Sequence, residues 1–89
     1  MTKQFSPELV YMLDALNQAG CRALILDIQK WNNNGQEYPW EEALINYPVS
    51  LGTLQEVGMI VVNQKKKIIR LTPKAIRVID SLFKAFQSR

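Results

Sequence analysis

Gly58 divides a short helical pattern from a β-branched run, and this helix-to-strand junction constrains the fold more than any other feature of the chain. Before it, Ser50 is a good N-cap for a helix over about residues 51–57, whose apolar residues share one face. After it, two β-branched runs, 59–62 and 68–72, flank a short polar connection. We therefore predict a short helix followed by a two-stranded β-hairpin.

Two further helices are predicted near the N-terminus. Pro7 suits the first position of a helix over about residues 7–18, because a proline there wastes no backbone donor. Gly20 is expected to end this helix in left-handed backbone. A second helix, over about 21–31, should stop at residues 32–35, since Asn and Gly favour turns.

Three more elements complete the predicted chain. A minimal strand is expected near residues 37–38, followed by a short helix over about 40–45. That helix must end before Pro48, since a proline pushes the preceding residue out of helical geometry. Pro73 then starts a long amphipathic helix over about 73–87.

The residue types in the chain exclude most catalytic chemistry. Histidine is absent, which removes the commonest general base and metal ligand. Cys21 is the only cysteine and lies on an apolar helix face, so we predict a packed core thiol. We expect no enzyme, cofactor or metal site. Without a signal peptide or an apolar run of the roughly 20 residues that span a membrane, residues 1–89 are predicted to form one cytoplasmic domain.

Charge is distributed unevenly along the sequence. Residues 1–63 carry three Lys or Arg against seven Asp or Glu, a net charge of −4. Residues 64–89 carry eight Lys or Arg against one Asp, a net charge of +7. This asymmetry indicates an anionic partner for the basic end. The alternative is a solvated face that keeps a small protein in solution.

Two motifs lie in order on either side of the basic turn of the hairpin. They are Leu51-x-x-Leu54-x-x-x-Gly58-Met59-Ile60 and Leu71-Thr72-Pro73-Lys74-Ala75. Together they resemble the end of the recognition helix and the close of the wing in winged helix-turn-helix transcription regulators of the MarR and PadR types. The resemblance covers roughly residues 40–77. It implies a mainly helical winged-helix fold with a small β-hairpin and additional N- and C-terminal helices.

The resemblance also implies a function, which is double-stranded DNA binding by a dimeric transcription regulator. The recognition helix would approach bases in the major groove, while the wing would contact phosphates, which give affinity but little sequence information. The alternative for the wing lysines is a solvated turn that discourages edge aggregation. The DNA-binding residues implied are Ser50, Thr53, Gln55, Lys65, Lys66, Lys67 and Arg70.

The helix before Gly58 differs from those of the regulators that it resembles. It is short, it carries no Arg or Lys, and it includes Glu56, which DNA phosphates would repel. The alternative function is therefore a winged-helix protein–protein interaction module that does not read DNA sequence.

A homodimer is the partner implied by the terminal helices, which build the dimer in the families resembled. The helix over residues 73–87 has a wide apolar face, and a chain this small offers little core to cover it. The alternative is that the helix packs only on its own domain. The predicted interface residues are Ile76, Ile79, Leu82, Phe83 and Phe86.

Overall fold

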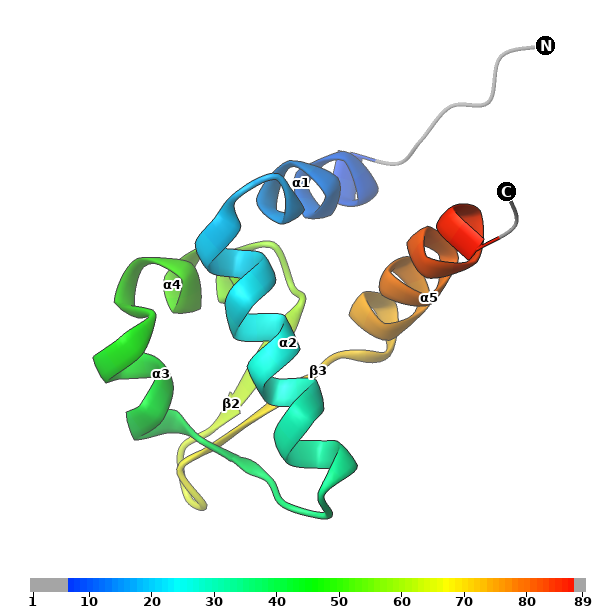
Figure 1. Cartoon of the computed structure of the whole chain (residues 1–89). Helices are drawn as coiled ribbons and strands as arrows, with labels where there is room; N and C mark the ends of the chain where they lie inside the picture. Colours follow the sequence, from blue (N-terminus) through cyan, green and yellow to red (C-terminus); the bar gives the residue numbers. More distant parts are fainter. Residues whose placement is uncertain (1–6, 88–89) are drawn as a thin grey trace, which may run out of the picture.

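The computed structural model describes residues 7–87, with the side chains of residues 7–82. This part of the chain is mainly helical with a small antiparallel sheet, which confirms the predicted class at that level (Figure 1). The elements in order are α1 (Pro7–Leu16), α2 (Ala19–Asn33), β1 (Tyr38–Pro39), α3 (Trp40–Asn46), α4 (Pro48–Glu56), β2 (Ile60–Asn63), β3 (Ile68–Leu71) and α5 (Pro73–Gln87).

The strands form one antiparallel sheet in the order β1-β3-β2, so β3 is the central strand. Ile69 of β3 pairs with Tyr38 on one side and with Val62 on the other. Ile69 is buried and the next residue, Arg70, is exposed, as the alternation of a strand requires. The strand predicted near residues 37–38 and the hairpin are both confirmed.

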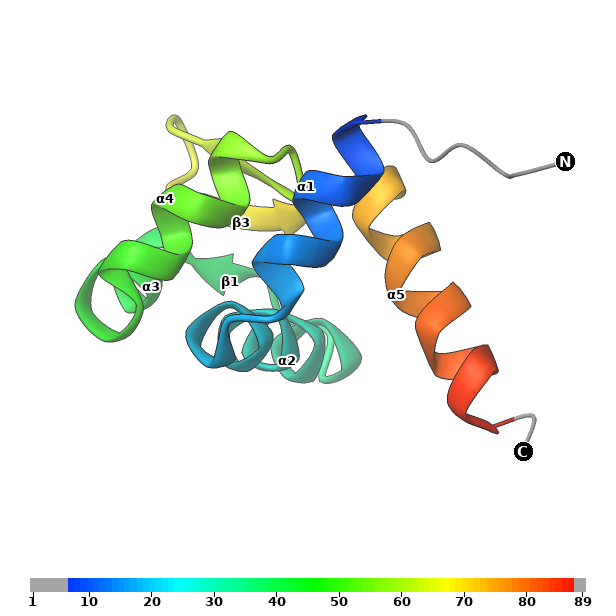
Figure 2. The same ribbon diagram turned by 90° about the horizontal axis from the view of Figure 1, so that it is seen from above.

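Helix α2 lies at the centre of the fold, where it packs against α1, α4, β1 and β3. Its side chains Leu24 and Ile28 are fully buried, and so is Cys21, which confirms the predicted core thiol. By contrast, α5 leaves the rest of the fold at an angle, and Ala75 and Ile79 in its first half pack on the core (Figure 2). Across residues 7–87, no helix has the length and apolar character needed to cross a membrane.

The prediction that Gly20 ends the first helix is wrong. α1 ends at Leu16, and Gly20 is the second residue of α2. A Cβ atom at position 20 would lie only 2.4 Å from the Oγ atom of Ser50 in α4. Gly20 is therefore required for the close approach of α2 to α4, and not for left-handed backbone.

The prediction that Ser50 caps the fourth helix is also wrong. α4 begins at Pro48, which places Ser50 in its first turn, where the side chain is 9% exposed. Tyr47 precedes the helix with φ −139° and ψ 54°, which is outside helical geometry, as expected before a proline. Pro48 therefore starts α4, because its fixed φ and missing N–H suit the first helical position.

The end of α2 lies two residues later than predicted. Asn32 and Asn33 continue the helix, and the chain turns only at Gly35, which has φ +77°. α3 and α5 match their predicted ranges closely.

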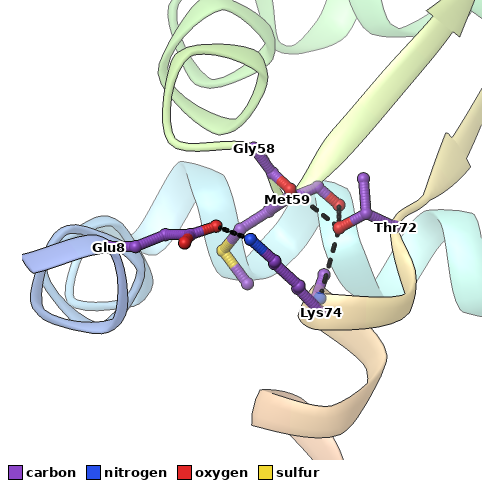
Figure 3. Close-up of polar contacts among 6 residues, drawn as sticks. Glu8, Gly58, Met59, Thr72 and Lys74 are labelled. Carbon is purple, nitrogen blue, oxygen red and sulfur yellow. Dashed lines mark hydrogen bonds and ion pairs between the residues drawn. The ribbon is translucent and has the colours of Figure 1, made fainter. Parts of the chain in front are cut away.

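Gly58 and Thr72 join the ends of three elements (Figure 3). Gly58 has φ +79°, and the N–H of Met59 donates to the carbonyl of Leu54 at 2.9 Å, which ends α4 as predicted. The Thr72 hydroxyl donates to the Gly58 carbonyl at 2.7 Å and accepts the N–H of Ala75 at 3.2 Å. Thr72 therefore caps α5 and ties its start to the end of α4.

The contact between Gly20 and Ser50 gives a testable prediction. Gly20→Ala should lower the free energy of unfolding by about 1–3 kcal/mol, because the added methyl group overpacks the α2–α4 contact. In a Ser50→Ala background the same change should be neutral or stabilising, since Ala exceeds Gly in helix propensity by about 1 kcal/mol. Urea denaturation of the four proteins measures this coupling.

Gly52→Ala is the matched control, because nothing lies within 4 Å of a Cβ added at that exposed position of α4. It should raise the free energy of unfolding by about 1 kcal/mol. An equal loss from Gly20→Ala in both backgrounds would contradict the proposed role of the glycine.

Candidate nucleic-acid interface

The hairpin turn between β2 and β3 holds its backbone in place while its lysines point to solvent. The Asn63 Oδ1 atom accepts the backbone N–H groups of Lys65 and Lys66, both at 3.1 Å. Lys67 has φ +54°, and its carbonyl accepts the N–H of Trp40 at 2.9 Å. All three lysine side chains are exposed. We call Lys65, Lys66 and Lys67 the lysine tip.

Two cations closer to the body of the fold, Arg70 and Lys74, have carboxylate partners. Arg70 in β3 is paired with Glu37, to which its Nε atom donates at 2.9 Å. Lys74 at the start of α5 is paired with Glu8 of α1 (Figure 3). Within residues 7–82, the lysine tip has no such carboxylate partner. Its positive charge is therefore available to an external anion, whereas that of Arg70, also predicted to contact DNA, is largely offset.

The structure separates the three side chains predicted to approach bases. Ser50 is buried against α2, so it does not belong to the outer surface of α4. Thr53 is half-buried, and its hydroxyl donates to the carbonyl of Val49 at 3.1 Å. Of the three, only Gln55 is exposed. The predicted reading face therefore offers few polar groups to a ligand.

The outer surface of α3 and α4 is instead apolar and acidic, which the sequence analysis missed. Leu44, Ile45 and Val49 are 43%, 77% and 76% exposed. A signal for the acidic character was present, because residues 31–64 contain four glutamates and no Lys or Arg. We call six exposed side chains of these helices the α3–α4 surface; they are Glu41, Glu42, Leu44, Ile45, Val49 and Glu56. The other exposed positions of the two helices are uncharged; they are Asn46, Pro48, Gly52 and Gln55.

The apolar face predicted on α5 divides between the core and solvent. Ile79 is 9% exposed and packs in its own domain, whereas Ile76 is 46% and Leu82 is 36% exposed. The side chains of Phe83 and Phe86 lie outside the described residues. Part of the predicted dimer surface is therefore used within the chain, and part remains open.

Asp27 in α2 interacts with two tyrosines, one before α3 and one after it. The Tyr47 hydroxyl donates to Asp27 Oδ2 at 2.9 Å, and the Tyr38 hydroxyl lies 3.5 Å from the same oxygen. The hydrogen bond to Asp27 raises the pKa of Tyr47, and burial raises that of Tyr38. Trp31 packs edge-on against Tyr38, with ring centroids 5.5 Å apart. This cluster holds the α3–α4 surface in place.

The residues described offer no group of metal ligands, and the single cysteine of the chain lies in the core. Cys21 is fully buried, and burial raises the pKa of its thiol, which disfavours the reactive thiolate. Among these residues there is also no group of three or more Cys, Asp or Glu side chains that could hold a metal ion.

Comparisons of the chain with family models, with curated proteins and with solved structures find no match.

The Asp27 cluster predicts a pH dependence of stability. The phenol groups of Tyr38 and Tyr47 are held neutral in the folded protein, so their contribution is complete below the ordinary tyrosine pKa of 10.0 and is lost as the pH rises above it. Tyr47→Phe should lower the free energy of unfolding at pH 7 by about 1 kcal/mol. It should also make the alkaline loss of stability shallower.

Urea denaturation followed by tryptophan fluorescence at a series of pH values measures both effects. Tyr11→Phe on the exposed side of α1 is the control and should leave the stability at pH 7 unchanged. The assignment fails if Tyr47→Phe loses stability with pH as steeply as the unmodified chain.

Proposed function

We propose that this chain is a winged helix-turn-helix domain that binds double-stranded DNA. The order α2, β1, α3, α4, β2, β3 supports the proposal, as does the β1-β3-β2 sheet. In this assignment α3 and α4 form the helix-turn-helix, and the hairpin of β2 and β3 is the wing. α1 and α5 are the additional terminal helices.

The main support for this function is that the lysine tip has no carboxylate partner among the described residues. Three adjacent ammonium groups stand in solvent on a turn whose backbone is fixed by Asn63. A row of phosphates suits such a group, because each contact releases a condensed counterion and adds affinity at low salt. The wing therefore supplies backbone contacts, as in a transcription regulator.

Base selectivity is low in this proposal. α4 carries no Lys or Arg, and the exposed Glu56 opposes approach of its C-terminal end to phosphates. Gln55 is the exposed amide on α4 that can hydrogen-bond a base edge. Binding thus comes mainly from phosphate contacts, which carry no sequence information directly.

Removing the lysine tip tests this function. The unmodified chain should bind a labelled DNA duplex at low salt with a Kd of about 10⁻⁶–10⁻⁵ M, near the range of non-specific binding. Lys65→Ala/Lys66→Ala/Lys67→Ala should abolish most of the affinity. It should also reduce the slope of log K against log salt by about 2–3, since each phosphate contact contributes about 0.9. Fluorescence anisotropy measures both quantities.

The matched control removes the same charge elsewhere, through Lys30→Ala/Lys74→Ala/Arg77→Ala, three exposed positions outside the tip. This variant should retain most of the affinity. An equal loss in both triple variants, or no binding by the unmodified chain at about 10⁻⁵ M protein, would contradict the proposal.

The regulator proposal includes a homodimer formed through α5. Ile76 and Leu82 leave apolar area open on a helix that projects from the fold (Figure 2). Burying this apolar area against α5 of a second copy of the chain is favourable, by about 25 cal/mol for each Å² removed from water. A twofold dimer would also present two lysine tips to one duplex, which increases affinity through effective concentration.

Charge substitutions on α5 test the dimer. The unmodified chain should sediment as a dimer, and Ile76→Glu or Leu82→Glu should weaken association at least about tenfold, because a buried, unpaired charge is costly. Leu26→Glu, at a position 60% exposed on α2, is the control and should leave association unchanged. A monomer at every concentration tested would contradict the dimer.

A protein-interaction module is the second candidate function. The exposed aliphatic side chains of the α3–α4 surface favour it, because protein interfaces are commonly built around apolar side chains. This function does not require DNA binding.

A further inference from the structure

The α3–α4 surface exposes aliphatic side chains that the fold does not use. Ile45 and Val49 are 77% and 76% exposed. Ala43, Leu51 and Leu54, on the opposite sides of the same helices, are buried and supply the core contacts of α3 and α4. The exposed side chains therefore contribute little to stability and are available to a partner.

The surface is also preorganised. Tyr47, the one residue between α3 and α4, is tied to α2 by its hydrogen bond to Asp27. The Thr53 hydroxyl donates to the carbonyl of Val49, within the first turns of α4. A partner would therefore bind a surface that is already ordered, so the entropy cost of ordering it on binding would be small.

The negative charge of this surface limits which kind of partner can bind to it. Glu41 lies three and four residues before Leu44 and Ile45, so these side chains share one side of α3. Glu42 accepts a hydrogen bond at 3.1 Å from the Asn46 amide, which carries no positive charge to offset that of a carboxylate. With no Lys or Arg in residues 31–64, the surface repels nucleic acid, anionic lipid and its own twofold copy.

We propose that the α3–α4 surface binds a cationic amphipathic helix of another protein. The apolar side of that helix packs on Leu44, Ile45 and Val49, while its Lys or Arg side chains pair with the surrounding glutamates. Apolar anchors with a charged rim are the usual composition of such interfaces, and an amphipathic helix supplies both at a spacing of three and four residues. The inference deepens the protein-interaction candidate and goes beyond the DNA-binding proposal, since it uses no residue of the lysine tip.

A designed peptide tests the partner class. The probe is a 14-residue helical peptide of Leu and Lys at amphipathic spacing, titrated calorimetrically into the full chain. It should bind at least about tenfold more tightly than a scrambled peptide of the same composition, or than its Leu and Glu counterpart. Ile45→Ser/Val49→Ser should weaken binding about tenfold, because truncated apolar anchors dominate interface losses. Glu41→Gln/Glu42→Gln should weaken it several-fold and reduce its salt dependence.

Two controls separate this proposal from the others. Leu26→Ser/Val61→Ser removes aliphatic side chains that are 60% and 53% exposed elsewhere, and should retain peptide affinity. Lys65→Ala/Lys66→Ala/Lys67→Ala should also retain it, even where DNA binding is lost. Equal binding of the Leu and Glu peptide, or unchanged affinity in Ile45→Ser/Val49→Ser, would overturn the proposal. Loss of self-association in that double variant would overturn it too, because the occupant would then be a second copy.

Discussion

The hydrogen bond between Gly58 and Thr72 is the constraint on which the arrangement of the C-terminal half depends. Gly58 turns the chain out of α4 through left-handed backbone, and the Thr72 hydroxyl bonds its carbonyl while capping α5. The N–H of Thr72 also donates to the carbonyl of Met59 at 3.0 Å, which closes the hairpin at its base. One threonine therefore fixes the directions of α4, the hairpin and α5 relative to one another, and with them the surfaces that each presents.

Charge then divides these surfaces. Glu37 and Glu8 offset Arg70 and Lys74, whereas the three adjacent lysines at the end of the hairpin have no carboxylate partner among the described residues. The α3–α4 surface carries three glutamates and no cation. An anionic ligand is therefore favoured at the lysine tip and opposed on α3 and α4, which suit a cationic one.

Local signals predicted most of the elements, whereas features that depend on distant contacts were missed. Gly58 ends α4 through its own left-handed backbone, and its place after a helical pattern was enough to predict that role. Thr72 caps α5 locally, through the N–H of Ala75, but its hydrogen bond to Gly58 spans fourteen residues and was not predicted. The roles of Gly20 and Ser50 arise from their mutual contact, and they lie thirty residues apart. The α3–α4 surface was missed because helices of seven and nine residues have too few turns for periodicity to identify their faces.

The contact between Trp40 and Lys67 limits how DNA could approach. The N–H of Trp40 donates to the Lys67 carbonyl, so the first turn of α3 lies beside the end of the lysine tip. A duplex bound at the tip therefore comes close to Glu41, which the structure exposes at that same turn. Repulsion between this carboxylate and the phosphates favours contact through the wing, with α3 held away from the backbone.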